Sequence, residues 1–103
     1  MSEKVVKMKV SEAQRLIREI YGERDSRRGI LGTSLHLGEE IGELFRAIRS
    51  RNHENIEDEL ADSLAWLLSV SELLEVDLEA AFLRRYGRGC PKCFSIPCRC
   101  PEV

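Results

Sequence analysis

The chain has 103 residues, which is enough for one small domain with a single hydrophobic core. Hydrophobic residues make up 43% of it and the formal net charge is −2, so no general attraction to nucleic acid or to a membrane surface is expected. No apolar run is long enough to cross a bilayer, and the charged start of the chain is unlike a signal peptide. We therefore expect a cytoplasmic protein that does not bind membranes.

Residues 1–9 are expected to be a flexible lead-in, and an amphipathic helix is predicted to follow. Ser11 and Gln14 have the spacing of a capping box, apolar residues then recur at helical intervals, and Gly22 is a natural stop. The polar stretch 23–34, which contains two glycines, is predicted to be a loop. Its arginines either face solvent or reach substrate phosphates.

A second helix is predicted to begin near residue 34, and a third to run over 53–74. Each has an apolar stripe that is expected to face the core. The stripe residues are Leu37, Ile41, Leu44 and Ile48 in the second helix, and Ile56, Leu60, Leu64, Leu67 and Leu74 in the third. A fourth helix is predicted from the N-cap Asp77 to about residue 86, before Gly87. Four amphipathic helices with short links favour an all-α, antiparallel four-helix bundle.

Two pairs of acids lie beside these stripes, and the two acids of each pair are three positions apart in the sequence. Glu40 and Glu43 form the first pair, and Glu59 and Asp62 form the second. Neighbouring like charges on a helix repel, and a divalent cation is the simplest partner that would stabilise four carboxylates together. The donors are all oxygen atoms, which favours Mg²⁺ or Mn²⁺ over zinc or iron. The other interpretation is that these acids are ordinary solvated surface.

The C-terminal tail, residues 88–103, contains all four cysteines with the spacing C-x₂-C-x₄-C-x-C. They are Cys90, Cys93, Cys98 and Cys100. Such a segment is too short to bury a core, so we expect a zinc-knuckle-like site in which four thiolates bind a structural Zn²⁺. Two disulfides, another metal or free thiols are the alternatives.

The acid pairs stand in two motifs, Glu39-Glu40-x-x-Glu43 and Glu59-x-x-Asp62. These resemble the hallmark of the MazG-like nucleotide pyrophosphohydrolases, in the all-α NTP pyrophosphatase group. The likeness extends through 21–25, 61–66 and 76–81, and covers most of residues 10–87. We expect these residues to form a MazG-like helical domain to which the cysteine tail is added.

The resemblance implies Mg²⁺-dependent hydrolysis of a nucleoside triphosphate between its α and β phosphates, which gives a monophosphate and pyrophosphate. It makes Glu40, Glu43, Glu59 and Asp62 the metal ligands and Glu39 a carboxylate that orients water. The candidates for contact with substrate are His36, Trp66, Arg84 and Arg85. Arginines stand here where the family often carries lysine. The family is typically dimeric or tetrameric, so a homodimer or homotetramer is expected.

A different class of function follows from the charge of the tail. No acid lies between positions 80 and 101, whereas this stretch contains Arg84, Arg85, Arg88, Lys92 and Arg99. The alternative is therefore a non-catalytic helical module that binds nucleic acid or a protein partner through a basic zinc tail.

Overall fold

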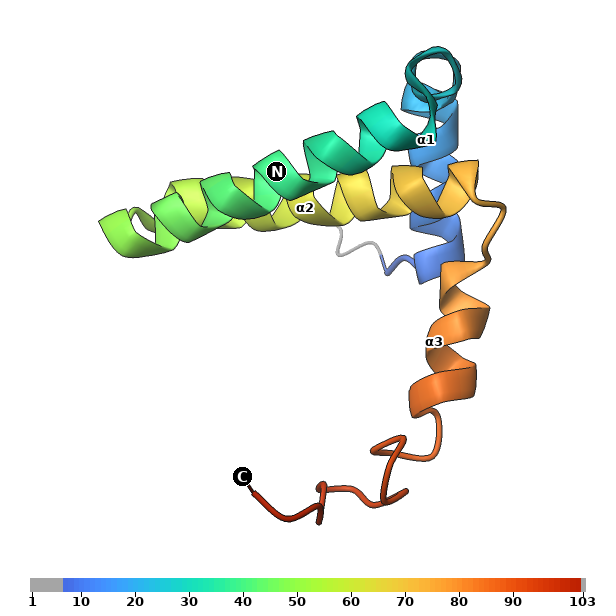
Figure 1. Cartoon of the computed structure of the whole chain (residues 1–103), viewed down its shortest axis with the longest axis vertical. Helices are drawn as coiled ribbons and strands as arrows, with labels where there is room; N and C mark the ends of the chain where they lie inside the picture. Colours follow the sequence, from blue (N-terminus) through green and yellow to red (C-terminus); the bar gives the residue numbers. More distant parts are fainter. Residues whose placement is uncertain (1–6, 103) are drawn as a thin grey trace, which may run out of the picture.

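In the computed structural model, which describes residues 7–102, the chain folds into three α-helices (Figure 1). Helix α1 runs over Val10–Ser50, α2 over His53–Leu73 and α3 over Leu78–Tyr86. These residues contain no strand, so the predicted all-α class is confirmed. Most of the predicted lead-in, residues 1–6, lies outside the described part of the chain. None of the three helices is both long and apolar enough to cross a membrane.

A four-helix bundle is not confirmed. Helix α1 takes the place of two predicted helices, and α3 extends away from the other two helices instead of packing along them (Figure 1). The molecule is therefore built around one pair of helices, the second part of α1 and all of α2.

Helix α1 changes direction at a single residue, Gly29, whose φ of 81° and ψ of 171° are not helical (Figure 1). A positive φ of this kind favours glycine because it has no Cβ. The loop predicted over 23–34 is wrong, since the residues on both sides of Gly29 are helical. Arginine and glutamate, which are good helix formers, are common before the kink and continue the helix through Gly22.

The N-cap of α1 lies two residues before the predicted one, Ser11. Lys9 is the N-cap, and its backbone N–H donates to Glu12 Oε1 at 3.2 Å. Ser11 lies inside the helix, and its N–H donates to Glu79 Oε1 of α3 at 3.1 Å. The predicted partner of Ser11, Gln14, has a different role.

Gln14 is buried and joins the start of α1 to the end of α2 and the start of α3. Its amide nitrogen donates to Glu72 Oε1 at 2.9 Å and to the carbonyl oxygen of Val76 at 2.8 Å. Its amide oxygen accepts a hydrogen bond from the N–H of Leu78 at 3.2 Å. One side chain thus fixes where the last helix begins.

The second part of α1 and α2 form an antiparallel hairpin (Figure 1). Arg51 ends α1 in the left-handed conformation, with φ 58°, and the Asn52 side chain caps α2 by accepting from the N–H of Asn55 at 3.2 Å. This tight connection sets the register of the two helices, and so brings the acids of α1 opposite those of α2.

The apolar stripes do not form an internal core. Among the described hydrophobic residues only Ala47 and Leu68 are fully buried. Six of the nine stripe residues are exposed: Ile41, Ile48, Leu60, Leu64, Leu67 and Leu74. The expectation that the stripes face a core within the chain is therefore wrong, because a hairpin with one laterally extended helix has no further layer to cover them.

Candidate active site

Three acidic side chains meet between the two arms of the hairpin. Glu40 and Glu43 lie one turn apart on α1, and Glu59 faces them from α2. One carboxylate oxygen from each residue lies within 4.8 Å of the other two. Glu40 is buried, Glu59 is half-buried and Glu43 is exposed. This acid cluster (Glu40, Glu43 and Glu59) is thus embedded on one side and open to solvent on the other.

The embedded part of the acid cluster lacks partners. Glu40 Oε1 and Glu59 Oε2 are buried and have no hydrogen-bond partner among the described residues. The Glu59 carboxylate, to which a protonated Glu40 could donate, together with burial and the charges of the surrounding acids, raises the pKa of Glu40 to about 7. The cluster alone therefore shares a proton near neutral pH. A divalent cation among the carboxylates would replace that proton and satisfy the unpartnered oxygens.

Two further acids of the predicted set lie outside the acid cluster. Asp62 follows Glu59 by one turn of α2 and lines a separate pocket, although its charge contributes to the raised pKa of Glu40. Glu39 is exposed, and its Oε2 lies 3.6 Å from His36 Nδ1. The structure thus brings three of the four predicted ligands together, places Asp62 near them and directs Glu39 to the solvent side.

The pocket that contains Asp62 has a volume of about 240 Å³. This pocket, called the Trp66 pocket below, is lined by Tyr21, Arg24, Asp25, Arg28, Asp62, Ala65 and Trp66. Arg28 donates to Asp25 Oδ1 at 2.9 Å, and its guanidinium lies 5.0 Å from the centre of the Trp66 ring in a cation–π contact. The His36 ring stacks on Trp66, with centroids 4.8 Å apart and planes 10° from parallel. The pocket therefore combines aromatic surface with guanidinium and carboxylate groups.

Part of this pocket comes from the stretch that the sequence predicts to be a loop. Asp25 and Arg28 lie one helical turn apart, and Asp25 is only 3% exposed whereas Arg28 is half-buried, so the pair is part of the folded structure and not of a solvated loop. An acid and a base at positions i and i+3 are the signal that indicates a helix here. No local sequence pattern predicts the contact of Arg28 with Trp66, because the two residues lie on different helices.

The two arginines predicted to contact substrate lie on α3. Arg85 lines a hollow beside the cysteine tail, and neither Arg84 nor Arg85 lines the Trp66 pocket or belongs to the acid cluster. Figure 1 shows the end of α3 well apart from the hairpin. Within one chain these arginines are therefore separated from the acids.

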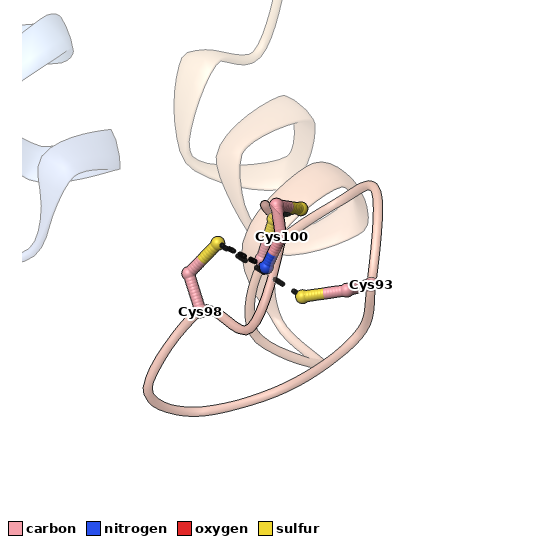
Figure 2. Close-up of side chains that lie close together, drawn as sticks. Cys93, Cys98 and Cys100 are labelled. Carbon is pink, nitrogen blue, oxygen red and sulfur yellow. Dashed lines mark hydrogen bonds between the residues drawn. The ribbon is translucent and has the colours of Figure 1, made fainter. Parts of the chain in front are cut away.

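A second group of potential metal ligands lies in the tail. The sulfur atoms of Cys90, Cys93, Cys98 and Cys100 all lie within 4.8 Å of one another, and none of the four forms a disulfide. Figure 2 shows Cys93, Cys98 and Cys100 of this group close together. The backbone N–H of Arg99 donates to Cys93 Sγ at 3.3 Å, and this bond is the largest of the effects that lower the pKa of Cys93 to about 6. The cluster is compatible with a bound metal ion.

Comparison with known families identifies the helical part of the chain. The model of the MazG nucleotide pyrophosphohydrolase domain matches residues 28–94. The match includes the acid cluster, Trp66, α2, α3 and the first two cysteines, whereas Cys98 and Cys100 lie beyond it. No protein of curated function matches the chain. Since the matched region spans well over half of its length, the chain belongs to the MazG nucleotide pyrophosphohydrolase family.

Proposed function

We propose that this protein hydrolyses nucleoside triphosphates between the α and β phosphates, and that it does so with Mg²⁺ or Mn²⁺ held by the acid cluster and Asp62. The observation that carries the proposal is the pair of buried, unpartnered oxygens on Glu40 and Glu59, which lie next to a third carboxylate, that of Glu43. Membership of a family of nucleotide pyrophosphohydrolases, which are typically dependent on divalent metal, supports it.

The donor set fits a hard dication. The acid cluster and Asp62 present only carboxylate oxygens, which suit Mg²⁺ or Mn²⁺, and two rigid helices hold them. When bound, the ion neutralises charge on the phosphates and lowers the pKa of the attacking water. Glu39 lies on the solvent side of the same helix and remains our candidate for orienting that water.

The Trp66 pocket supplies groups for the nucleotide itself. Trp66 provides aromatic surface for a base and is held by the stacked ring of His36 beside the pocket, while Arg24 and Arg28 provide positive charge for phosphates. At about 240 Å³ the pocket is smaller than the roughly 300–1,000 Å³ of most ligand sites, so it holds part of a nucleotide at most.

A homodimer or homotetramer would complete this pocket, and we propose that the protein forms one. The exposed residues of the apolar stripes support this assembly, because a second copy would remove them from water. It would also provide a route by which Arg84 and Arg85 of one subunit approach the acids of another.

A panel of ribo- and deoxyribonucleoside triphosphates, incubated with Mg²⁺ and assayed for pyrophosphate, tests the proposal. We expect release from at least one of them, and loss of that release in Glu59→Gln. Glu57→Gln is the matched control, because Glu57 lies on the same helix but is exposed. Its carboxylate lies 3.6 Å from His53 and is not part of the acid cluster. No release from any nucleotide by the folded wild-type protein would exclude the activity.

A second candidate function is a module that binds nucleic acid through its tail. Phe94 and Ile96 are exposed among Lys92 and Arg99, and aromatic surface between basic groups suits single-stranded nucleic acid. This function predicts salt-dependent binding that is weakened in Lys92→Gln/Arg99→Gln. A wild-type chain without affinity for single-stranded DNA or RNA at low salt would reject it.

A further inference from the structure

The tail has a backbone conformation that burial of its apolar side chains does not explain. Phe94 adopts a left-handed conformation with φ 58°, which is unfavourable for a residue with a Cβ and persists only where its surroundings impose it. Its side chain is 63% exposed, so burial of the ring does not impose it. The neighbouring Ile96 is 81% exposed as well. Backbone hydrogen bonds hold this turn instead, since the N–H of Phe94 donates to the carbonyl oxygen of Cys90 at 2.7 Å, and the turn therefore forms at the cysteines.

The four sulfurs are spaced as a tetrahedral metal site requires. Cys90 Sγ and Cys100 Sγ lie 3.7 Å apart, and Cys93 Sγ and Cys98 Sγ lie 4.0 Å apart. Zinc with four sulfurs at about 2.3 Å keeps them about 3.8 Å from one another, whereas a disulfide needs about 2.05 Å. The separations thus suit four thiolates around one ion.

Backbone groups around the sulfurs are arranged to stabilise negative charge. The N–H of Arg99 donates to Cys93 Sγ at 3.3 Å. The N–H of Cys100 donates to Cys98 Sγ at 3.4 Å (Figure 2). Four thiolates around a dication keep a net negative charge, and the basic residues of the tail offset it. Two backbone N–H groups thus stabilise negative charge on the sulfurs of Cys93 and Cys98.

Gly89 allows the loop to close over the site. Its φ is 106°, and a Cβ at this position would lie 2.7 Å from the carbonyl oxygen of Ser95 and 2.8 Å from Ile96 Cγ1. The N–H of Cys90 also donates to that carbonyl oxygen, at 3.1 Å. The backbone thus approaches itself closely at the point where the first cysteine enters the cluster.

We propose that Cys90, Cys93, Cys98 and Cys100 bind one Zn²⁺ in a closed tetrahedral site and that this ion folds the tail. Four protein ligands leave no position for water or substrate, so the site is structural. The proposal does not depend on the hydrolase activity, since the tail is separate from the acid cluster (Figure 1).

Metal analysis of the full chain, purified under reducing conditions, tests the proposal. We expect one zinc per chain, and replacement by Co²⁺ should give the absorption bands of tetrahedral thiolate coordination. Cys93→Ser and Cys98→Ser should each lower zinc affinity by at least tenfold while the helical circular dichroism is kept. Glu102→Gln is the control, because Glu102 is exposed and lies beyond the last ligand, and it should bind zinc like the wild type.

A second variant tests the geometry without changing a ligand. Gly89→Ala should weaken zinc binding, because the added methyl group obstructs loop closure. The proposal is overturned if the reduced wild-type chain binds no added zinc, or if the isolated protein contains two disulfides by mass and no metal. Cobalt spectra that indicate fewer than four sulfur ligands in the wild type would also contradict it.

Discussion

Glu40 is a buried acid that is held against another acid, and such a position lowers stability unless a cation is bound. Its Oε1 has no hydrogen-bond partner among the described residues, and the carboxylates of Glu43 and Glu59 are its neighbours. An unpartnered buried oxygen and like charges are both unfavourable. We infer that these carboxylates are placed for metal binding and that they lower the stability of the metal-free protein.

Changing Glu40 to Gln should therefore have opposite effects on stability and on activity. In metal-free protein we expect the free energy of unfolding to rise by about 1 kcal/mol, because the amide carries no charge and can donate to Glu59. This corresponds to an increase of several degrees in Tm. The kcat/KM for nucleotide hydrolysis should fall about 100-fold or more, because a metal ligand is lost. Thermal unfolding in EDTA and a pyrophosphate assay in Mg²⁺ measure the two effects. A variant that is less stable without metal yet fully active would contradict both assignments.

The same residue predicts how the stability of the metal-free protein depends on pH. The pKa of Glu40 is about 7 in the folded chain, above its ordinary value of 4.5, so the folded state binds more protons between these values. The free energy of unfolding should then fall as pH rises from about 5 to 8. Urea unfolding across this range measures the slope.

Saturating Mg²⁺ should flatten or reverse this slope, because the ion competes with the proton for the same oxygens. Glu40→Gln should lose most of the dependence. An unchanged slope in Glu40→Gln would mean that other groups cause it.

At the scale of elements, the kink at Gly29 decides where the pocket residues lie. The residues before it form the helical turn with Asp25 and Arg28, and those after it form the arm that contains Glu40. Without this bend, a continuous helix would carry Arg28 away from Trp66. One glycine thus sets the position of the Trp66 pocket relative to the acid cluster.

Gly29→Ala should destabilise the protein by about 1–2 kcal/mol, because a φ of 81° with ψ of 171° is strained for a residue with a Cβ. It should also raise KM as Arg28 is displaced. Gly22→Ala is the control, because Gly22 is helical and a Cβ there would meet only Arg18 Cγ at 3.4 Å; alanine should be neutral or stabilise by up to about 1 kcal/mol. Equal thermal stability of the two variants would contradict this role of the kink.

Features that depend on local spacing could be predicted from the sequence. Residues three apart share a helix face, so the pairing of Glu40 with Glu43 follows from the helix alone. The cysteines gather because the last of them is only ten positions after the first. The break at Gly29 could not be localised, since one glycine in a polar stretch suits a long loop as well as a kink. What covers the apolar stripes was also beyond prediction, because a helical wheel identifies a shared face and not its partner.

At the scale of the whole molecule, the exposed stripes predict self-association. Leu64 lies one turn from Leu60 on α2, and the two are 50% and 52% exposed. Leu64→Glu should convert an oligomer to monomer and reduce hydrolysis at the same time, because a charge would be buried at the interface. Light scattering after gel filtration, together with the activity assay, measures this.

Glu54→Lys is the control for that experiment, because it changes an exposed charge near the start of α2 and should leave the assembly intact. Wild-type protein that is monomeric at all concentrations would contradict the expected oligomer. A monomeric Leu64→Glu variant with full activity would show instead that one chain contains the complete site.

The hydrogen bonds of the Gln14 amide affect how the attachment of α3 depends on dissolved ions. Two of its three hydrogen bonds are made with backbone groups, those of Val76 and Leu78, which neither titrate nor lose strength as ions are added. The carboxylates in the hairpin are the groups that dissolved cations would bind, whereas the bonds of Gln14 to Val76 and Leu78 involve no carboxylate. A chelator should thus alter the hairpin while α3 stays attached to the start of α1.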